Sequence, residues 1–251
     1  MIFRKIFISL FIALFIPVVL SPVAGAGQGG DSDLAVAQDR TRSVEDRSRA
    51  VMALGRSGDP NASGPLLQIL KNPAEQRKVR AGAVMALARI GEPRAEILSA
   101  YETTYKSPKS GQNLRYTTLL AFGTMKAVES LPLLTEALSG GDDRIRFKAA
   151  QALGMIGDDD AVNLLLSRLE AEGDRMVRAE IVRALAQNES ASVEGALVRV
   201  LRSDTDPLVR YNAALCLAKF TSISPEGREA LRAAGGDSSP MVRKAAGGAG
   251  R

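Results

Sequence analysis

The chain has 251 residues, of which 24% are charged and 45% apolar, a composition typical of a folded globular chain of one or two domains. It contains no His, no Trp and a single Cys, Cys216. These absences exclude a Ser/His or Cys/His catalytic dyad, an imidazole metal ligand, an internal disulfide and a multi-cysteine zinc or iron–sulfur site.

The first 26 residues have the three parts of a secretory signal peptide. A basic start with Arg4 and Lys5 precedes an apolar run from Ile6 to Leu20, and Ala24-Gly25-Ala26 supplies the small residues that signal peptidase accepts. The alternative is an uncleaved membrane anchor, but a run of about 15 residues is shorter than the roughly 20 that a spanning helix needs. We therefore expect a signal peptide over residues 1–26, and a mature protein that is periplasmic or secreted and has no integral membrane span.

After the signal, the chain divides into a linker and a repetitive region. Residues 27–42 are rich in Gly, Ser, Asp and Gln without a sustained period, which predicts a flexible linker. From residue 43 to residue 251, the segment VRAGAVMALARIGE, which begins at Val79, recurs in variant forms at intervals of 31 to 35 residues. The intervals predict units over residues 43–75, 76–110, 111–141, 142–173, 174–205 and 206–238, with a partial unit over 239–251.

Each unit is predicted to contain two helices. In the fourth unit, Ile145, Ala149 and Leu153 fall on one face of a first helix, which Gly157 ends, and a Leu-rich stripe marks the second helix. The starts of the first helices carry capping residues: Ser43, Asp142, Asp174, Asp206 and Ser239. The expected fold class is all-α, an αα-superhelix of about six helix pairs closed by a partial C-terminal capping unit.

The motif V-R-x-x-A-x-x-A-L-G-x-I-G-D, seen most clearly from Ile145 to Asp158, resembles that of HEAT repeats, and in particular the HEAT-like repeats of phycobilisome bilin lyases. The resemblance covers nearly the whole mature chain. It implies a right-handed curved solenoid whose second helices line the concave side. Proteins with this repeat serve as scaffolds or as accessory factors, so the resemblance is specific for architecture and not for function.

An arginine recurs at the same motif position in every unit: Arg47, Arg80, Arg115, Arg146, Arg178, Arg210 and Arg243. We expect these side chains to tie adjoining repeats together by reaching carbonyl or acidic groups such as Asp142, Asp174 or Asp206. The alternative is a guanidinium surface for phosphate or nucleic acid. The net charge of +5, from 33 basic and 28 acidic residues, falls to +3 without the signal and to −4 once the seven arginines are set aside. Nucleic acid is therefore not an expected partner.

Two further features have a structural and a functional interpretation. Asp142-Asp143 and Asp158-Asp159-Asp160 offer oxygens for calcium but lack the EF-hand spacing, so helix capping is the expected role. Cys216 lies where a small apolar residue is expected, which predicts a buried, unreactive thiol; pairing with another molecule is the alternative. No metal and no cofactor are expected.

The second unit departs from the pattern. Its second helix, from Arg94 to about Tyr105, replaces leucines with Tyr101 and Tyr105, and the Lys106–Gly111 segment lengthens the following connection. Insertions in repeat arrays often map to a binding face, so Tyr101, Tyr105, Lys106 and Lys109 are candidate partner contacts. The simpler interpretation is that both tyrosines continue the buried stripe.

The sequence predicts a non-catalytic, extracytoplasmic scaffold or adaptor that binds an unidentified protein partner. The alternative is a lyase-like or chaperone-like accessory factor for a cofactor-bearing protein, against which the export signal argues. A third class, an enzyme that uses only carboxylates, needs two acids about 5–10 Å apart in a cleft, and the sequence offers no way to pair them.

Overall fold

A computed structural model describes residues 32–247, and the chain divides into residues 1–32 and a compact unit from Asp33 to Arg251. The predicted signal peptide and residues 248–251 lie outside the described residues. Within them the compact unit is all-α, without a strand, so the predicted fold class is confirmed. Its helices are α1 (Asp33–Gln38), α2 (Val44–Ser57), α3 (Ser63–Lys71), α4 (Arg77–Ile90), α5 (Arg94–Lys106), α6 (Gly111–Thr124), α7 (Leu131–Ser139), α8 (Asp143–Ile156), α9 (Asp159–Ala171), α10 (Arg175–Leu185), α11 (Ala191–Ser203), α12 (Pro207–Leu217), α13 (Pro225–Ala234) and α14 (Pro240–Gly247), with short 3₁₀ turns at Pro60–Ala62 and Val128–Ser130.

The helix starts follow the capping chemistry read from the sequence. Ser43 accepts the N–H of Asp46, Asp142 accepts those of Arg144 and Ile145, and Asp174 and Asp206 make the same kind of bond at α10 and α12. Asp158 caps α9 by accepting the N–H of Ala161 at 2.8 Å. These side chains satisfy backbone donors that an isolated helix end leaves free, and the capping roles predicted for Ser43, Asp142, Asp158, Asp174 and Asp206 are confirmed. The capping role of Ser239 at α14 stays a prediction.

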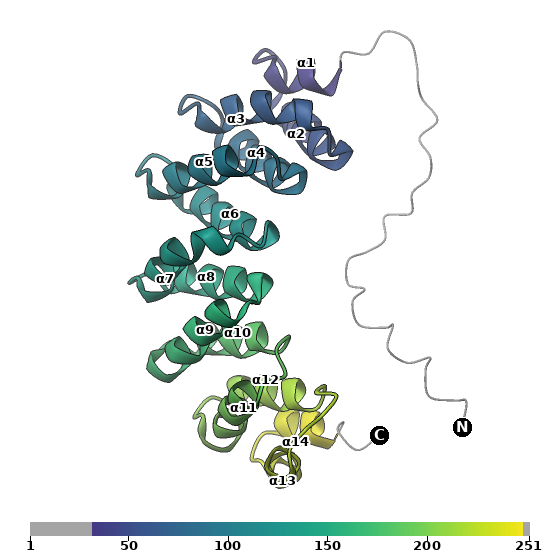
Figure 1. The fold of residues 1–251 in the computed structure, drawn as a ribbon, viewed down its shortest axis with the longest axis vertical. Helices are drawn as coiled ribbons and strands as arrows, with labels where there is room; N and C mark the ends of the chain where they lie inside the picture. The colour runs from purple at the N-terminus through teal and green to yellow at the C-terminus, as the bar shows by residue number, and fades with distance from the viewer. Residues whose placement is uncertain (1–31, 248–251) are drawn as a thin grey trace, which may run out of the picture. The chain divides into compact units, whose positions relative to one another are not determined.

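The helices form six pairs, α2/α3 to α12/α13, and α14 adds a partial seventh unit (Figure 1). We call the even-numbered members α2 to α14 the first helices and the odd-numbered members α3 to α13 the second helices. The unit curves with its first helices on the inner side and its second helices on the outer side (Figure 1). The expectation that second helices line the concave side is therefore wrong.

Close packing between consecutive first helices explains the direction of the curve. A Cβ atom at Gly123 would lie 2.8 Å from the Cα of Ala152, and one at Gly154 would lie 2.6 Å from the Cβ of Ala184. Only glycine permits such an approach, because a real Cβ would overlap its neighbour. On the outer side a pocket of about 600 Å³ opens between α5 and α7. The layer with the shorter spacing lies on the inside of the curve.

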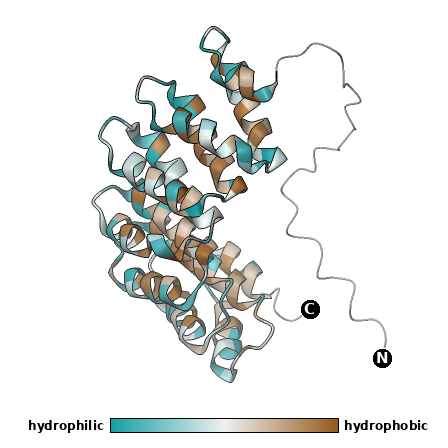
Figure 2. Cartoon of the chain, turned by 45° about the horizontal axis from the view of Figure 1, so that its top comes forward, coloured by the Kyte–Doolittle hydropathy of each residue, from teal (hydrophilic) through white to brown (hydrophobic). Residues whose placement is uncertain are grey.

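The core runs along the interface between the two layers. Buried leucine, alanine, valine and isoleucine side chains occur in every helix pair, and the hydrophobic residues follow the helix contacts while the connecting loops are mostly hydrophilic (Figure 2). Each helix pair exposes its apolar stripe unless a neighbouring pair covers it, so stability depends on stacking.

The segment predicted as a flexible linker, residues 27–42, contains α1. Ala37 is fully buried, and its carbonyl accepts hydrogen bonds from Nε and Nη2 of Arg47 at 3.0 Å each. The linker prediction is therefore wrong for Asp33–Gln38. A helix of six residues is too short to show a periodic pattern, and here it covers the open end of α2.

The opposite end of the array is closed by α14. Val242 is fully buried, as the capping interpretation of the partial unit requires. The helix ends at Gly247, within the glycine-rich tail. None of the helices described between residues 32 and 247 is long and apolar enough to cross a membrane.

Candidate functional site

The recurring arginines lie at one edge of the solenoid, where each first helix meets two inter-unit loops. Four of them bind a carboxylate in the loop that follows their own unit: Arg47 binds Glu75, Arg146 binds Glu172, Arg178 binds Asp204 and Arg210 binds Asp237. Arg146, Arg178, Arg210 and Arg243 also donate from Nη1 to carbonyls of the preceding loop. The loops that carry Glu172, Asp204 and Asp237 are thus held from both sides, which links one unit to the next.

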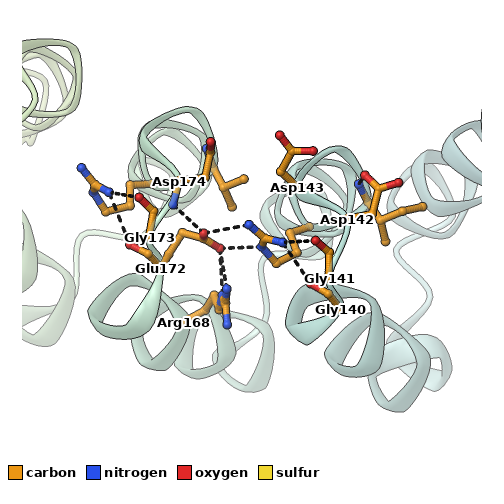
Figure 3. Close-up of polar contacts among 12 residues, drawn as sticks. Gly140, Gly141, Asp142, Asp143, Arg168, Glu172, Gly173 and Asp174 are labelled. Atoms are coloured by element: carbon orange, nitrogen blue, oxygen red, sulfur yellow. Dashed lines mark hydrogen bonds and ion pairs between the residues drawn. The ribbon is translucent and has the colours of Figure 1, made fainter.

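Glu172 is the most fully surrounded carboxylate of this series (Figure 3). It accepts hydrogen bonds from Arg146 and Arg168, at 2.9 Å from each Nε, and from the backbone N–H of Asp174 at 2.8 Å. Its side chain is 1% exposed. Burial alone would raise the pKa of Glu172, but the donors from Arg146, Asp174 and Arg168 lower it to about 2.

The arginines contact acidic and carbonyl groups as predicted, but the three acids named as acceptors are wrong. Asp142, Asp174 and Asp206 accept N–H groups at their helix starts. Their side chains are therefore used for capping, and the acceptors are the loop carboxylates that lie 26 to 28 residues after each arginine.

Three of the seven arginines have no carboxylate partner among the described residues: Arg80, Arg115 and Arg243, the last of which donates only to the carbonyls of Asp237 and Ser238. Arg80 is 6% exposed and donates to the carbonyl of Leu70 at 2.9 Å, and burial lowers its pKa, with Glu75 opposing that shift. Arg115 donates to the carbonyl of Ser107 at 3.3 Å, and its Nε has no hydrogen-bond partner. The loops after the second and third units place Ser107 and Gly140 where the other units place an acid, so the carboxylate series is interrupted there.

The structure does not assemble the four candidate contact residues of the second unit into one patch. Tyr101 is fully buried, donates its hydroxyl to the carbonyl of Val84 and packs edge-on against Phe122 with ring centroids 5.7 Å apart. It cannot contact a partner, and the prediction is wrong for this residue. Tyr105 is half-buried, Lys106 is exposed but pairs with Glu102 at 2.6 Å, and Lys109 is exposed.

Cys216 is buried, as predicted. Its side chain is within the core at 5% exposure, and its Sγ lies 3.6 Å from the carbonyl oxygen of Val182. Burial raises the pKa of the thiol to about 11, so the reactive thiolate is disfavoured. In the described part of the chain, no three acidic or Cys side chains gather in a way that could hold a metal ion.

A pocket of about 810 Å³ lies on the exposed face of α6, α8 and α10, which is the concave side of the array (Figure 1). We call it the concave pocket. Its lining combines apolar and polar groups: Leu120, Lys126, Lys148, Gln151, Gly154, Met155, Ile156, Gly157, Glu180, Arg183, Ala184 and Gln187. The residues are drawn from three consecutive units, so the pocket exists only in the stacked array.

Glu180 is the buried acid of the concave pocket. It is 3% exposed; Nη1 of Arg183 lies 2.9 Å from its Oε2, but out of line for a hydrogen bond, so Oε2 accepts none. Burial raises the pKa of Glu180, and Arg183, Lys148 and a hydrogen bond from Gln151 counteract only part of that effect. Buried polar atoms without partners are rare in folded proteins and point to a functional role.

A second pocket of about 300 Å³ adjoins it, since Lys148 lines both. This smaller pocket includes Tyr116 and Phe147, which are half-buried, and Met176, which is 47% exposed. The hydroxyl of Tyr116 is buried without a hydrogen-bond partner. Aromatic and Met side chains beside unsatisfied polar atoms are typical of surfaces that bind proteins.

The fold and its concave face define an α-solenoid built from helix-pair repeats. A sequence profile described as HEAT repeats matches residues 34–100, 109–186 and 163–249. The chain belongs to the HEAT-repeat family. No curated protein matches it.

Solved structures with the same fold include YibA of Escherichia coli, with a TM-score of 0.54, 14% identity, and coverage of 89% of this chain and 93% of that one. The complex of CpcE and CpcF of phycocyanin lyase from Nostoc sp. has a TM-score of 0.53 and 18% identity, with 90% of this chain and 96% of that chain covered. Importin β has a TM-score of 0.51 and 18% identity, with 86% and 32% covered. At these identities the similarity concerns the fold alone.

Proposed function

We propose that this chain is a non-catalytic, extracytoplasmic scaffold or adaptor whose concave face binds a partner protein. The observation that carries the proposal is the concave pocket, a solvent-facing cavity of about 810 Å³ whose lining from three consecutive units combines two lysines, a buried ion pair and apolar groups. Met155, which is 42% exposed, is part of this lining. Flexible Met side chains adapt to the surface of a partner.

Cross-linking in the native envelope with an amine-reactive reagent, followed by mass spectrometry, tests which face binds. Lys126 and Lys148 line the concave pocket, whereas Lys71 and Lys106 end the second helices α3 and α5 on the outer side. We expect cross-links to a partner from Lys126 and Lys148. Cross-links confined to Lys71 and Lys106 would contradict the proposal.

The extracytoplasmic part of the proposal depends on the predicted signal peptide over residues 1–26. Intact-mass measurement of the protein from the envelope fraction is expected to give a mature chain that starts at Gly27. A full-length chain recovered from the cytoplasm would overturn the proposed location but would not contradict the proposed binding face.

An accessory role toward a cofactor-bearing protein is the second candidate, motivated by the fold shared with the phycocyanin lyase components. Incubation of the purified chain with a bilin, followed by absorbance spectroscopy, separates the two. A stable bilin absorbance band on the chain would favour the accessory role, and we expect none.

A further inference from the structure

The concave pocket carries unbalanced charge. Its cations are Lys126, Lys148 and Arg183, and Glu180 is its one acid. Arg183 is already paired with Glu180, whereas Lys126 and Lys148 have no ion pair among the described residues. Asp143 and Asp174 line the adjoining pocket, but both accept backbone N–H groups at helix starts. Two ammonium groups therefore remain available to a ligand.

The polar groups of the pocket are held in place. Lys148 donates from Nζ to Oε1 of Gln151 at 2.9 Å, and the Gln151 side chain in turn hydrogen bonds to the Glu180 carboxyl. Oε2 of Glu180 is buried and faces Nη1 of Arg183 at 2.9 Å, so the Glu180 carboxylate is used within the protein and neutralises Arg183.

The pocket lining also contains apolar and small residues. Leu120 and Met155 line it together with Gly154 and Ala184, which pack closely against each other. Because Gly154 and Ala184 are small, they leave space in the pocket. This space accommodates the methylene groups of a side chain or the backbone of an extended segment. No aromatic ring on which a base could stack lines this pocket, which disfavours a nucleic acid.

We propose that the concave pocket receives an acidic segment of the partner protein, with Lys126 and Lys148 pairing its carboxylates. The inference rests on the proposed function, because it names the chemistry of the partner at the same surface. Charge complementarity selects the partner segment.

Fluorescence anisotropy with three labelled peptides tests the inference. The peptides have the same length and alternate Gly with Glu, Gln or Lys, and the full chain is titrated into each. We expect the Glu peptide to bind at least tenfold more tightly than the Gln peptide and the Lys peptide not to bind. Raising the salt concentration from about 0.05 M to about 0.5 M is expected to weaken binding of the Glu peptide several-fold, because the Debye length shortens.

Lysine variants locate the site. Lys126→Ala and Lys148→Ala are each expected to weaken binding of the Glu peptide about threefold, and the double variant about tenfold, as exposed ion pairs do. Lys71→Ala, which removes the same charge at the end of the outer helix α3, is the matched control and is expected to leave affinity unchanged. Circular dichroism and a thermal scan check that each variant is folded.

Several results would overturn the inference. They are equal binding of the Glu and Gln peptides, an unchanged affinity in the double variant, weaker binding by Lys71→Ala equal to that of the double variant, and equally tight binding of a single-stranded oligonucleotide. If the chain cross-links a partner through Lys126 and Lys148 but does not bind the Glu peptide, the acidic-segment inference fails and the proposed function stands. If cross-links come only from the outer helices, the proposed function fails as well.

Discussion

Replacement of Glu172 by Gln tests whether the arginine–carboxylate series holds the repeats together. The substitution keeps the shape of the side chain but removes the charge that Arg146 and Arg168 share. Breaking a buried ion pair costs about 3–5 kcal/mol, and because the two arginines are 12% and 21% exposed, water can hydrate them and the lower end applies. A pKa displaced from its usual value of 4.5 to about 2 corresponds to about 3 kcal/mol.

The assay is thermal unfolding followed by circular dichroism at pH 7. For a chain of this size about 3 kcal/mol lowers the midpoint by about 6–12 °C. Glu170→Gln is the matched control, because Glu170 lies two residues earlier in the last turn of α9, is 73% exposed and pairs with Arg199 at 3.4 Å. We expect it to shift the midpoint by less than about 2 °C. Equal shifts for the two variants would refute the structural role of Glu172.

The same residue predicts a pH dependence whose sign follows from its lowered pKa. A carboxyl with a lower pKa in the folded state contributes stability above its unfolded pKa and loses it as pH falls through the folded value. The difference between the wild type and Glu172→Gln is therefore expected to be largest above about pH 5 and to vanish near pH 2. A constant difference between pH 7 and pH 3 would contradict the assigned cause.

Three further substitutions test packing, the buried acid and the buried tyrosine. Gly154→Ala is expected to destabilise the chain by about 2 kcal/mol in urea unfolding, because its Cβ would overlap Ala184, whereas Gly173→Ala, with open space around it, is nearly neutral. Burial raises the pKa of Glu180, so its ionised form destabilises the folded chain at pH 7. Glu180→Gln is therefore expected to raise the unfolding midpoint at pH 7, and to raise it less at pH 4, where the wild-type acid is more protonated. An equal effect at both pH values would contradict this explanation. Tyr101→Phe is expected to cost about 1 kcal/mol through its lost hydrogen bond, and no change in stability would contradict that assignment.

The fold could be predicted because its pattern is repeated. Apolar residues at helical spacing, a capping residue before each first helix and a constant arginine position identify helix pairs without any tertiary information. The six-residue α1 escaped detection because it is shorter than two helical turns. Its evidence is tertiary: a buried Ala37 whose carbonyl meets Arg47.

The family resemblance predicts the wrong direction of curvature, whereas the sequence motif itself predicts the right one. The A-L-G motif places Gly123 and Gly154 at the contact between consecutive first helices. A layer built with glycine and alanine at its contacts has the shorter spacing, and it must lie on the inside of a curve. The motif therefore contained a physical argument that predicts concave first helices.

The concave pocket could not be found in the same way, because its residues occupy solvent-facing positions of the motif. Lys148 and Glu180 hold the same motif position in consecutive units, where other units carry Gly82, Thr117 and Asn212. Nothing in the sequence distinguishes such positions from an ordinary polar surface. These positions form a pocket only when three units stack, and stacking also buries the acid at one of the positions, Glu180.

The basic residues available to a partner are those without an ion pair, and the net charge does not identify them. Arg47, Arg146, Arg178 and Arg210 are neutralised by loop carboxylates, which removes them from any account of surface charge. Lys126 and Lys148 have no such acid within the described residues and line a cavity. A basic isoelectric point that arises from paired arginines cannot attract nucleic acid, whereas two lysines without an ion pair can attract a short acidic segment. The proposed binding chemistry therefore depends on lysines that the arginine–carboxylate series leaves unpaired.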